Sequence, residues 1–260
     1  MREQGYFSNR QRILKMTTNL NTVLITGASS GIGLDVARGF LERGSNVVLN
    51  ARNSEKLAAA AQALGHENKI ALVPGDIGNR ETGEKMVDTA VERFGSVDVL
   101  VNNAGIFGVK SFLDSTEEDL DKYIRINLKG TYFVTQAAVR QMKKQDGGSI
   151  VNIGTVLINH SSASIPASAA LITKGGVHAL TTSLASELAG DNIRVNAVAP
   201  GIIRTPIYGD ADVDAFGGVA LMNRVGEVQE ISEAVIYLAT ASFTTGVIMP
   251  VDGGYVHGRA

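Results

Sequence analysis

The stretch Thr26-Gly27-Ala28-Ser29-Ser30-Gly31-Ile32-Gly33 sets three glycines between an apolar run, Val23–Thr26, and an amphipathic segment. A turn this tight needs residues without a Cβ, so that the backbone can approach an anion closely. The free N–H groups and partial positive charge of a helix N-terminus then suit a phosphate. The spacing is Gly-x3-Gly-x-Gly, which differs from the Gly-x-Gly-x-x-Gly fingerprint. We interpret the stretch as a cradle for a dinucleotide pyrophosphate, with a purely structural turn as the alternative.

Outward from this turn, apolar strands alternate with helices along the whole chain. We expect strands at residues 23–26, 47–49, 70–73, 97–101, 149–153, 192–198 and 247–251. Helices are expected at residues 32–43, 54–64, 80–94, 116–144, 166–189 and 230–239, the fourth of them broken near Asp119–Lys122. Strands separated by helices imply right-handed crossovers and a parallel sheet. The sequence therefore predicts an α/β fold, a single doubly wound Rossmann domain with a seven-stranded parallel sheet flanked by helices.

The domain organisation follows from the same pass along the chain. No linker, repeat or low-complexity segment divides it, so we expect one dinucleotide-binding and catalytic domain over residues 20–260. Residues 1–19 are interpreted as an N-terminal arm. Residues 1–15 are basic but lack an apolar core, so they do not resemble a secretory signal. A basic targeting segment and a biological start at Met16 remain alternatives.

Composition excludes several classes of function. The net charge of the 260 residues is −2, which gives no field that favours nucleic acid or an anionic membrane. The absence of cysteine rules out disulfides, thiol nucleophiles and thiolate metal sites. No apolar run is long enough to span a bilayer. We expect a cytoplasmic protein without nucleic-acid or membrane partners, and we predict no metal site.

The end of the second predicted strand indicates which cofactor the cradle binds. An NAD-specific site has an acid there that holds the ribose 2′-hydroxyl. This chain has Asn50-Ala51-Arg52-Asn53, without an acid, and Arg52 could pair with a 2′-phosphate. A solvated surface arginine is the alternative. The sequence favours NADP(H) over NAD(H).

Several further motifs occur in a fixed order, and together they resemble the classical branch of the short-chain dehydrogenase/reductase family. After the glycine turn, they are Asn102-Asn103-Ala104-Gly105, Ile126-Asn127-Leu128-Lys129-Gly130, Asn196-Ala197-Val198-Ala199-Pro200-Gly201 and Val251-Asp252-Gly253-Gly254. The resemblance runs from about residue 20 to residue 256, nearly the whole chain. It implies a small-molecule substrate and a homo-oligomer, either a tetramer or a dimer.

The resemblance also implies the residues that bind the cofactor. They are Gly27, Ser29, Ser30, Gly31, Ile32, Gly33, Arg52, Asp76, Ile77, Asn103, Ala104, Gly105, Lys174, Pro200, Gly201, Ile203 and Thr205. Among these, Asp76 and Ile77 would lie beside the adenine. Asn103 and Gly105 would line the cofactor, and Thr205 would meet the nicotinamide carboxamide.

The catalytic residues match the family only in part. The family uses an asparagine, a serine, a tyrosine as acid or base, and a lysine that lowers the pKa of that tyrosine. Asn127 and Lys174 match, and Thr155 stands at the serine position. The tyrosine belongs four residues before the lysine, on the same helix face, and that position is Ala170. The chain thus resembles an atypical member without the active-site tyrosine, and its interval from Thr155 to Ala170 is longer than expected.

Two other side chains could replace the missing acid. Tyr208 lies in a long segment, Thr205–Val225, that follows a strand and has the position of a substrate lid. His160 lies in the loop after Thr155, and histidine titrates near neutral pH. A solvated loop histidine is the more ordinary interpretation. Water relayed through Lys174 and Asn127 is a third route.

Three functions remain open at this stage. The leading hypothesis is an NADP(H)-dependent oxidoreductase that acts on a carbonyl or alcohol with an altered proton donor. The second is an NADP(H)-binding protein without dehydrogenase activity, a sensor or assembly subunit, which Ala170 favours and the otherwise complete cofactor site disfavours. The third keeps the cofactor and catalyses another reaction, such as isomerisation. The substrate stays undefined.

Overall fold

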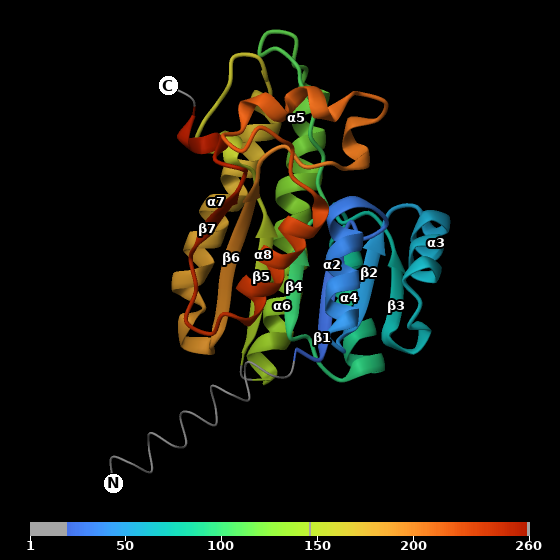
Figure 1. Cartoon of the computed structure of the whole chain (residues 1–260). Helices are drawn as coiled ribbons and strands as arrows, with labels where there is room; N and C mark the ends of the chain where they lie inside the picture. Colours follow the sequence, from blue (N-terminus) through green and yellow to red (C-terminus); the bar gives the residue numbers. More distant parts are fainter. Residues whose placement is uncertain (1–19, 146, 259–260) are drawn as a thin grey trace.

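The computed structural model describes residues 20–145 and 147–258, so the predicted arm lies outside the described residues. Seven strands form one sheet in the order β3-β2-β1-β4-β5-β6-β7 (Figure 1). They are β1 (Thr22–Thr26), β2 (Asn46–Ala51), β3 (Ile70–Pro74), β4 (Val99–Asn102), β5 (Gly148–Ile153), β6 (Ile193–Pro200) and β7 (Ile248–Val251). All six strand pairs are parallel. The predicted seven-stranded parallel sheet is confirmed.

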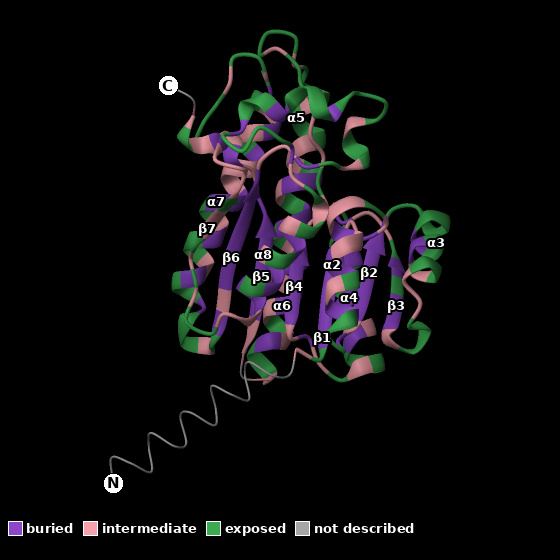
Figure 2. Ribbon diagram, viewed as in Figure 1, coloured by how far each residue is buried: buried purple, intermediate pink, exposed green. Residues whose placement is uncertain are grey.

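Helices cover both faces of this sheet. They are α2 (Gly31–Glu42), α3 (Ser54–Leu64), α4 (Arg80–Phe94), α5 (Glu117–Tyr123), α6 (Thr131–Met142), α7 (Ser168–Glu187) and α8 (Val228–Thr240). Successive strand residues point to opposite faces. Val23 and Ile25 therefore pack with α2 and α8, whereas Leu24 packs with α4 and α6. The five inner strands are buried almost throughout (Figure 2), which explains their continuous apolar runs, whereas β3 and β7 at the sheet edges are partly exposed.

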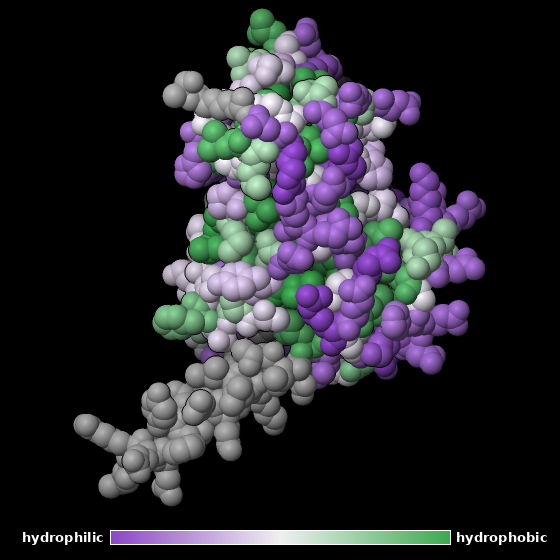
Figure 3. All heavy atoms as spheres, viewed as in Figure 1, coloured by the Kyte–Doolittle hydropathy of each residue, from purple (hydrophilic) through white to green (hydrophobic). Residues whose placement is uncertain are grey.

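The outer helix surfaces are polar, and several helix ends follow local signals in the sequence. Hydrophilic side chains cover much of the face that carries α2, α3 and α8 (Figure 3). The Asn53 side chain accepts a 2.8 Å hydrogen bond from the Lys56 backbone N–H at the start of α3. Gly95 ends α4 with a φ of 85°, a left-handed conformation that favours glycine. In the part of the chain that the structure describes, no helix has both the length and the apolarity that a membrane crossing requires.

The break in the long fourth helix differs from the expected one. Asp119 lies in the first turn of α5, where it forms a capping box with Thr116, so the expected break at Asp119–Lys122 is wrong. Acidic side chains stabilise a helix start because they offset the unpaired N–H groups there. The irregular part is η2 (Ile124–Gly130), a π-helical segment that contains Asn127. Such segments often occur at functional sites.

Other boundaries also differ from the sequence-based expectation, by up to two residues. The fourth strand begins at Val99, two residues later than expected. Pro166 does not open α7, which begins at Ser168; the Pro166 carbonyl instead accepts a hydrogen bond from Lys110. The segment predicted to be a lid contains two short helices, η6 (Pro206–Tyr208) and η7 (Val213–Val219), beyond the carboxyl end of β6.

Candidate active site

A cavity of about 890 Å³ opens at the carboxyl ends of the strands. The segments after β1 and β4 meet there, at the point where the strand order reverses. Ligands of open α/β sheets bind in such a crevice. Of the cofactor-binding and catalytic residues predicted from the sequence, all line this cavity except Gly33 and Asn127. The fold therefore brings together segments that lie far apart in the chain.

The glycine turn presents open backbone to the cavity. Gly27 and Gly31 have φ values of 66° and 55°, in the left-handed region that glycine adopts without strain. A Cβ at Gly27 would lie 2.8 Å from the Cα of Ala104. Ser30 makes no side-chain cap at the start of α2, and the first turn holds no acidic residue. The N–H groups of this turn are therefore available to an anion.

Gly33 has a different role from its two neighbours in the motif. A Cβ at this position would lie 2.4 Å from the Asn103 Nδ2 and 2.5 Å from the Gly27 carbonyl oxygen. Asn103 Nδ2 donates 3.0 Å hydrogen bonds to the carbonyls of Thr26 and Gly27. Gly33 thus lets Asn103 tie the segment after β4 to the turn after β1, and it stands behind the cavity wall.

Arg52 and Asp76 line the cavity at the ends of β2 and β3. Asp76 forms an ion pair of 2.7 Å with Arg125. Burial raises the pKa of Asp76, but hydrogen bonds from Arg125 and the Gly78 backbone, with the charges of Arg125 and Arg52, lower it overall. The sequence analysis missed Arg125. It also missed Asn50, whose Nδ2 donates hydrogen bonds to the backbone carbonyls of Val73 and Gly75 next to Asp76.

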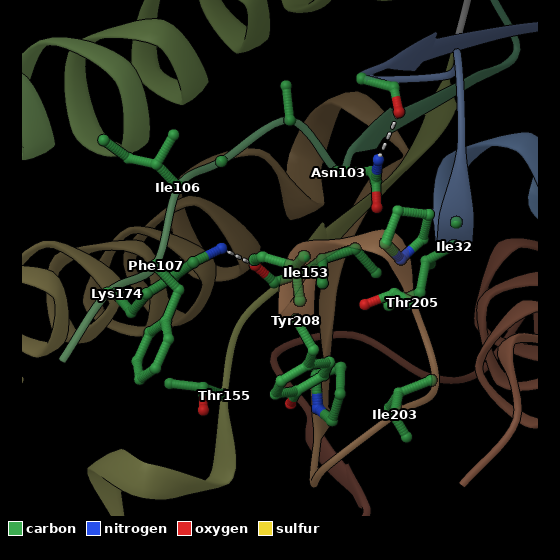
Figure 4. Close-up of a pocket in the computed structure, with 18 of the residues that line it drawn as sticks. Ile32, Asn103, Ile106, Phe107, Ile153, Thr155, Lys174, Ile203, Thr205 and Tyr208 are labelled. Carbon is green, nitrogen blue, oxygen red and sulfur yellow. Dashed lines mark hydrogen bonds between the residues drawn. The ribbon is translucent and has the colours of Figure 1, made fainter. Parts of the chain in front are cut away.

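Lys174 reaches the other end of the cavity from α7. Its Nζ donates a 2.7 Å hydrogen bond to the carbonyl of Ile153 (Figure 4). Burial lowers the pKa of Lys174 to about 8. A Cβ at Gly105 would lie 3.2 Å from Lys174 Nζ and 3.2 Å from Asn127 Oδ1, so glycine leaves room for both groups. The amine is desolvated, and its proton is held less tightly than usual.

Asn127 is fully buried in η2 and supports the cavity from behind. Its Oδ1 accepts a 2.8 Å hydrogen bond from Ile106 N–H, and its Nδ2 donates to the Ile106 carbonyl at 3.0 Å. The same Nδ2 donates to Thr173 Oγ1 at 3.1 Å. The side chain thus joins the segment after β4 to α7, one residue before Lys174.

Thr155 lines the cavity beside Lys174, and a buried histidine stands behind it. The Thr155 backbone N–H donates to His178 Nε2 at 3.4 Å. Burial, followed by the charge of Lys174, lowers the pKa of His178, so this ring is neutral and its Nε2 can accept. Sequence analysis missed His178, although its position four residues after Lys174 put it on the same face of α7.

The groups considered as substitute acids lie in different places. Ala170 is fully buried and does not line the cavity. His160 is exposed, does not line the cavity, and packs edge-on against Tyr255 with ring centroids 5.3 Å apart. Tyr208 does line the cavity, and burial raises its pKa against the effect of a backbone hydrogen bond at Ile203. Tyr255, which sequence analysis missed, also lines it.

No group of histidine, aspartate or glutamate side chains suited to a metal ion occurs within residues 20–145 and 147–258. The chemistry available in the described cavity is therefore that of an open anion cradle at one end and a desolvated amine with a neighbouring hydroxyl at the other. These two features are what a bound dinucleotide and a reacting oxygen atom require.

Comparisons with known proteins agree with this arrangement. The family model for short chain dehydrogenases matches residues 21–214. A 3-oxoacyl-(acyl-carrier-protein) reductase of Thermotoga maritima is 38% identical over 240 residues, covering 90% of this chain and 96% of the relative. An L-rhamnose-1-dehydrogenase of Scheffersomyces stipitis is 37% identical over 258 residues, covering 92% and 98%.

A solved structure extends the likeness to three dimensions. The crystal structure of a short-chain type dehydrogenase/reductase from Mycobacterium marinum superposes with a TM-score of 0.87 at 33% identity. The match covers 94% of this chain and 98% of the other. With its sheet order, its glycine turn and its matched sequence, the chain belongs to the short-chain dehydrogenase family.

Proposed function

We propose that this protein is an NADP(H)-dependent oxidoreductase that interconverts a carbonyl compound and an alcohol, with a proton donor other than the family's tyrosine. The observation that carries the proposal is the single cavity that joins the glycine turn, Arg52 and Lys174. Its volume of about 890 Å³ is in the range of ligand pockets. A nicotinamide cofactor supplies or accepts the hydride when it is bound.

Residues of the chain fit the two ends of that cofactor. The open N–H groups at the start of α2 suit the pyrophosphate. Gly105 leaves space beside Lys174, and Lys174 Nζ is within the cavity lining that a nicotinamide ribose would contact. Ile203 and Thr205 line the cavity after β6 and would border the nicotinamide.

The choice of NADP(H) rests on Arg52. It lies next to the end of β2, no acid occupies residues 50–53, and Asp76 is paired with Arg125. A guanidinium can bond a phosphate through two N–H groups at once. We expect the Arg52→Ala variant to lose about tenfold in NADPH affinity, with NADH affinity unchanged, in fluorescence titrations. Equal affinity of the unaltered protein for NADH and NADPH would overturn the choice.

Lys174 is our candidate for the proton donor. A general acid works best when its pKa lies near the operating pH, and burial lowers the pKa of Lys174 to about 8. Its Nζ would give a proton to the carbonyl oxygen, directly or through one water, while hydride reaches the carbonyl carbon. Thr155 Oγ1 would hold that oxygen. His160 is a weaker candidate, because it is exposed and does not line the cavity.

Ala170 favours a second candidate function, a cofactor-binding protein without dehydrogenase activity. A buried methyl group can neither donate nor accept a proton. NADPH binding would be measured by fluorescence, and carbonyl-dependent NADPH consumption would then be screened across a broad panel. Binding without turnover, together with turnover gained in Ala170→Tyr, would replace the oxidoreductase proposal with this one. Turnover by the unaltered chain would exclude it.

A further inference from the structure

The reaction end of the cavity is enclosed by apolar side chains from three separate segments. Phe107 and Val109 follow β4, Leu157 and Ile165 follow β5, and Ile207 and Phe216 belong to the segment after β6. Figure 4 shows Ile106, Phe107 and Tyr208 around the position of Lys174 and Thr155. Three separate segments therefore contribute apolar side chains, and Ser164, Tyr208 and Tyr255 add hydroxyl groups to the same lining.

Charge is distributed unevenly along this cavity. Among the described residues that line it, the charged ones are Arg52, Asp76 and Lys174. Arg52 and Asp76 follow β2 and β3, at the far side of the glycine turn from β5 and β6. Lys174 is committed to the Ile153 carbonyl and, under the proposed function, to the reacting oxygen. The enclosure thus offers no charged partner to the rest of a substrate.

Three of these apolar side chains are more exposed than core residues of the same kind. Val109 is 58% exposed, Ile207 is 57% exposed and Phe216 is 43% exposed, and all three line the cavity. Apolar area of this size is stabilised when a ligand removes it from water. An apolar ligand body would cover these three side chains, whereas a body with many hydroxyl groups would lose its water and regain few hydrogen bonds.

From the composition of this enclosure we infer that the substrate is an uncharged and largely apolar ketone, or the matching alcohol. Its charged contacts are confined to Lys174 at the reacting oxygen, and its other polar contacts are limited to the few hydroxyl groups of the lining. Polyhydroxylated sugars and carboxylate-bearing oxo acids are disfavoured. This inference rests on the proposed function for the identity of the reacting group, but the predicted preference for an apolar body rests on the cavity lining alone.

Three cyclohexanones of similar size separate these substrate classes. They are 4-tert-butylcyclohexanone, the pentahydroxylated ketone inosose, and 4-oxocyclohexanecarboxylate. Calorimetry on the full chain saturated with NADP⁺ measures binding, because the oxidised cofactor cannot reduce a ketone, and the absorbance of NADPH shows whether a hydroxyl group of inosose is oxidised instead. We expect the alkyl ketone to bind at least about tenfold more tightly than either polar probe, since each unmade hydrogen bond or unpaired charge costs about this much. Equal or tighter binding of either polar probe, or no binding of the alkyl ketone, would overturn the inference.

The outcome for the proposed function is distinct from this one. If NADP⁺ fails to bind, the proposed function fails, and the same three ketones are then titrated against the protein alone. If the alkyl ketone binds with the expected preference but NADPH is never consumed, the substrate-class inference stands and the oxidoreductase proposal does not.

A matched pair of variants tests whether the enclosure is the binding site. Phe216 and Phe243 are both exposed phenylalanines, but only Phe216 lines the cavity. Phe216→Ser should weaken binding of 4-tert-butylcyclohexanone about tenfold, and Phe243→Ser should leave it unchanged. Circular dichroism and thermal unfolding check that both variants fold. An equal effect of the two substitutions, or no effect of Phe216→Ser, would contradict the assignment.

Discussion

Lys174 combines two properties that rarely occur in one side chain, a buried amine and a place in an open cavity. Because burial lowers its pKa to about 8, the ammonium form predominates below that pH and the neutral form above it. If Lys174 donates the proton, carbonyl reduction needs the ammonium form. We predict that kcat for reduction is flat from neutral pH to about pH 8 and falls about tenfold per pH unit above it.

The control for this pH dependence is the variant Lys174→Met, which removes the titrating group. Its reduction rate should be lower by about 10²–10⁴ and should lack the alkaline limb. The reverse reaction needs the neutral amine, so alcohol oxidation should rise through the same pH range. A pH profile of reduction that is the same in the variant and the unaltered chain would exclude Lys174 as the donor.

His178 acts one step further from the reacting atoms, through the backbone of Thr155. Its neutral Nε2 accepts from the Thr155 N–H at 3.4 Å. We predict that His178→Leu lowers kcat about tenfold or more, because a small displacement of Thr155 weakens its hold on the substrate oxygen. The Kd of NADPH should not change. Steady-state kinetics and fluorescence titration separate the two effects.

A second variant distinguishes positioning from simple packing. His178→Gln keeps an acceptor oxygen and should recover part of the kcat that His178→Leu loses. Since burial and Lys174 both lower the pKa of His178, protonation belongs below the ordinary histidine range. The loss of activity that His178 causes in the unaltered chain should therefore appear only at acidic pH, where the ring becomes a donor and no longer accepts, and it is separate from the alkaline loss predicted for Lys174. Equal kcat in both variants would reduce His178 to a packing residue.

Two glycines lie where a helix closely contacts a neighbouring element of the fold. Gly33 in α2 abuts Asn103, and Gly83 in α4 abuts Val134 of α6, where a Cβ would lie 2.9 Å from the Val134 Cα. Both glycine-to-alanine changes should destabilise the fold by about 1–3 kcal/mol, measured by denaturant unfolding. Only Gly33→Ala should also weaken NADPH binding, because it displaces Asn103 from the glycine turn.

The two variants thus control for each other. A loss of NADPH affinity in Gly83→Ala as large as that in Gly33→Ala would mean that general destabilisation, and not the position of the turn, sets the affinity. Unchanged NADPH affinity in Gly33→Ala would show that the contact between Asn103 and the turn can shift at no cost to the cradle.

Most elements could be predicted from the sequence because their signals are local. Five of the strands are apolar runs buried almost throughout, and Gly95 ends α4 directly after its last helical residue. The break at η2 could not be predicted in this way. It coincides with the bonds from Asn127 to Ile106 and Thr173, which lie 21 and 46 residues away in the chain.

Some residues of the candidate site could also be predicted from the sequence, and others could not. Motif residues such as Asn103 and Lys174 could be predicted because their spacing resembles a known pattern. His178, Tyr255 and Asn50 carry no such pattern, and their importance depends on what the fold packs against them. The sequence readily indicates the motif residues of a site. It indicates less readily the residues that hold those motif residues in position.

For the molecule as a whole, the cavity lies between segments that follow all seven strands, so a ligand there links both halves of the sheet. A ligand that binds only the folded chain stabilises it by RT ln(1 + [L]/Kd), about 2.7 kcal/mol at a hundredfold excess over Kd. For a chain of 260 residues, each kcal/mol raises Tm by about 2–4 °C. We therefore predict that NADPH at this excess raises Tm by about 5–11 °C.

At the same concentration NADH should raise Tm less than NADPH does, because NADH lacks the phosphate that Arg52 would bind. Thermal unfolding followed by circular dichroism measures both shifts, and Arg52→Ala should bring the NADPH shift down to that of NADH. Equal shifts for the two cofactors with the unaltered chain would contradict the role of Arg52 while leaving the cradle intact, and no shift with either would contradict the cradle itself.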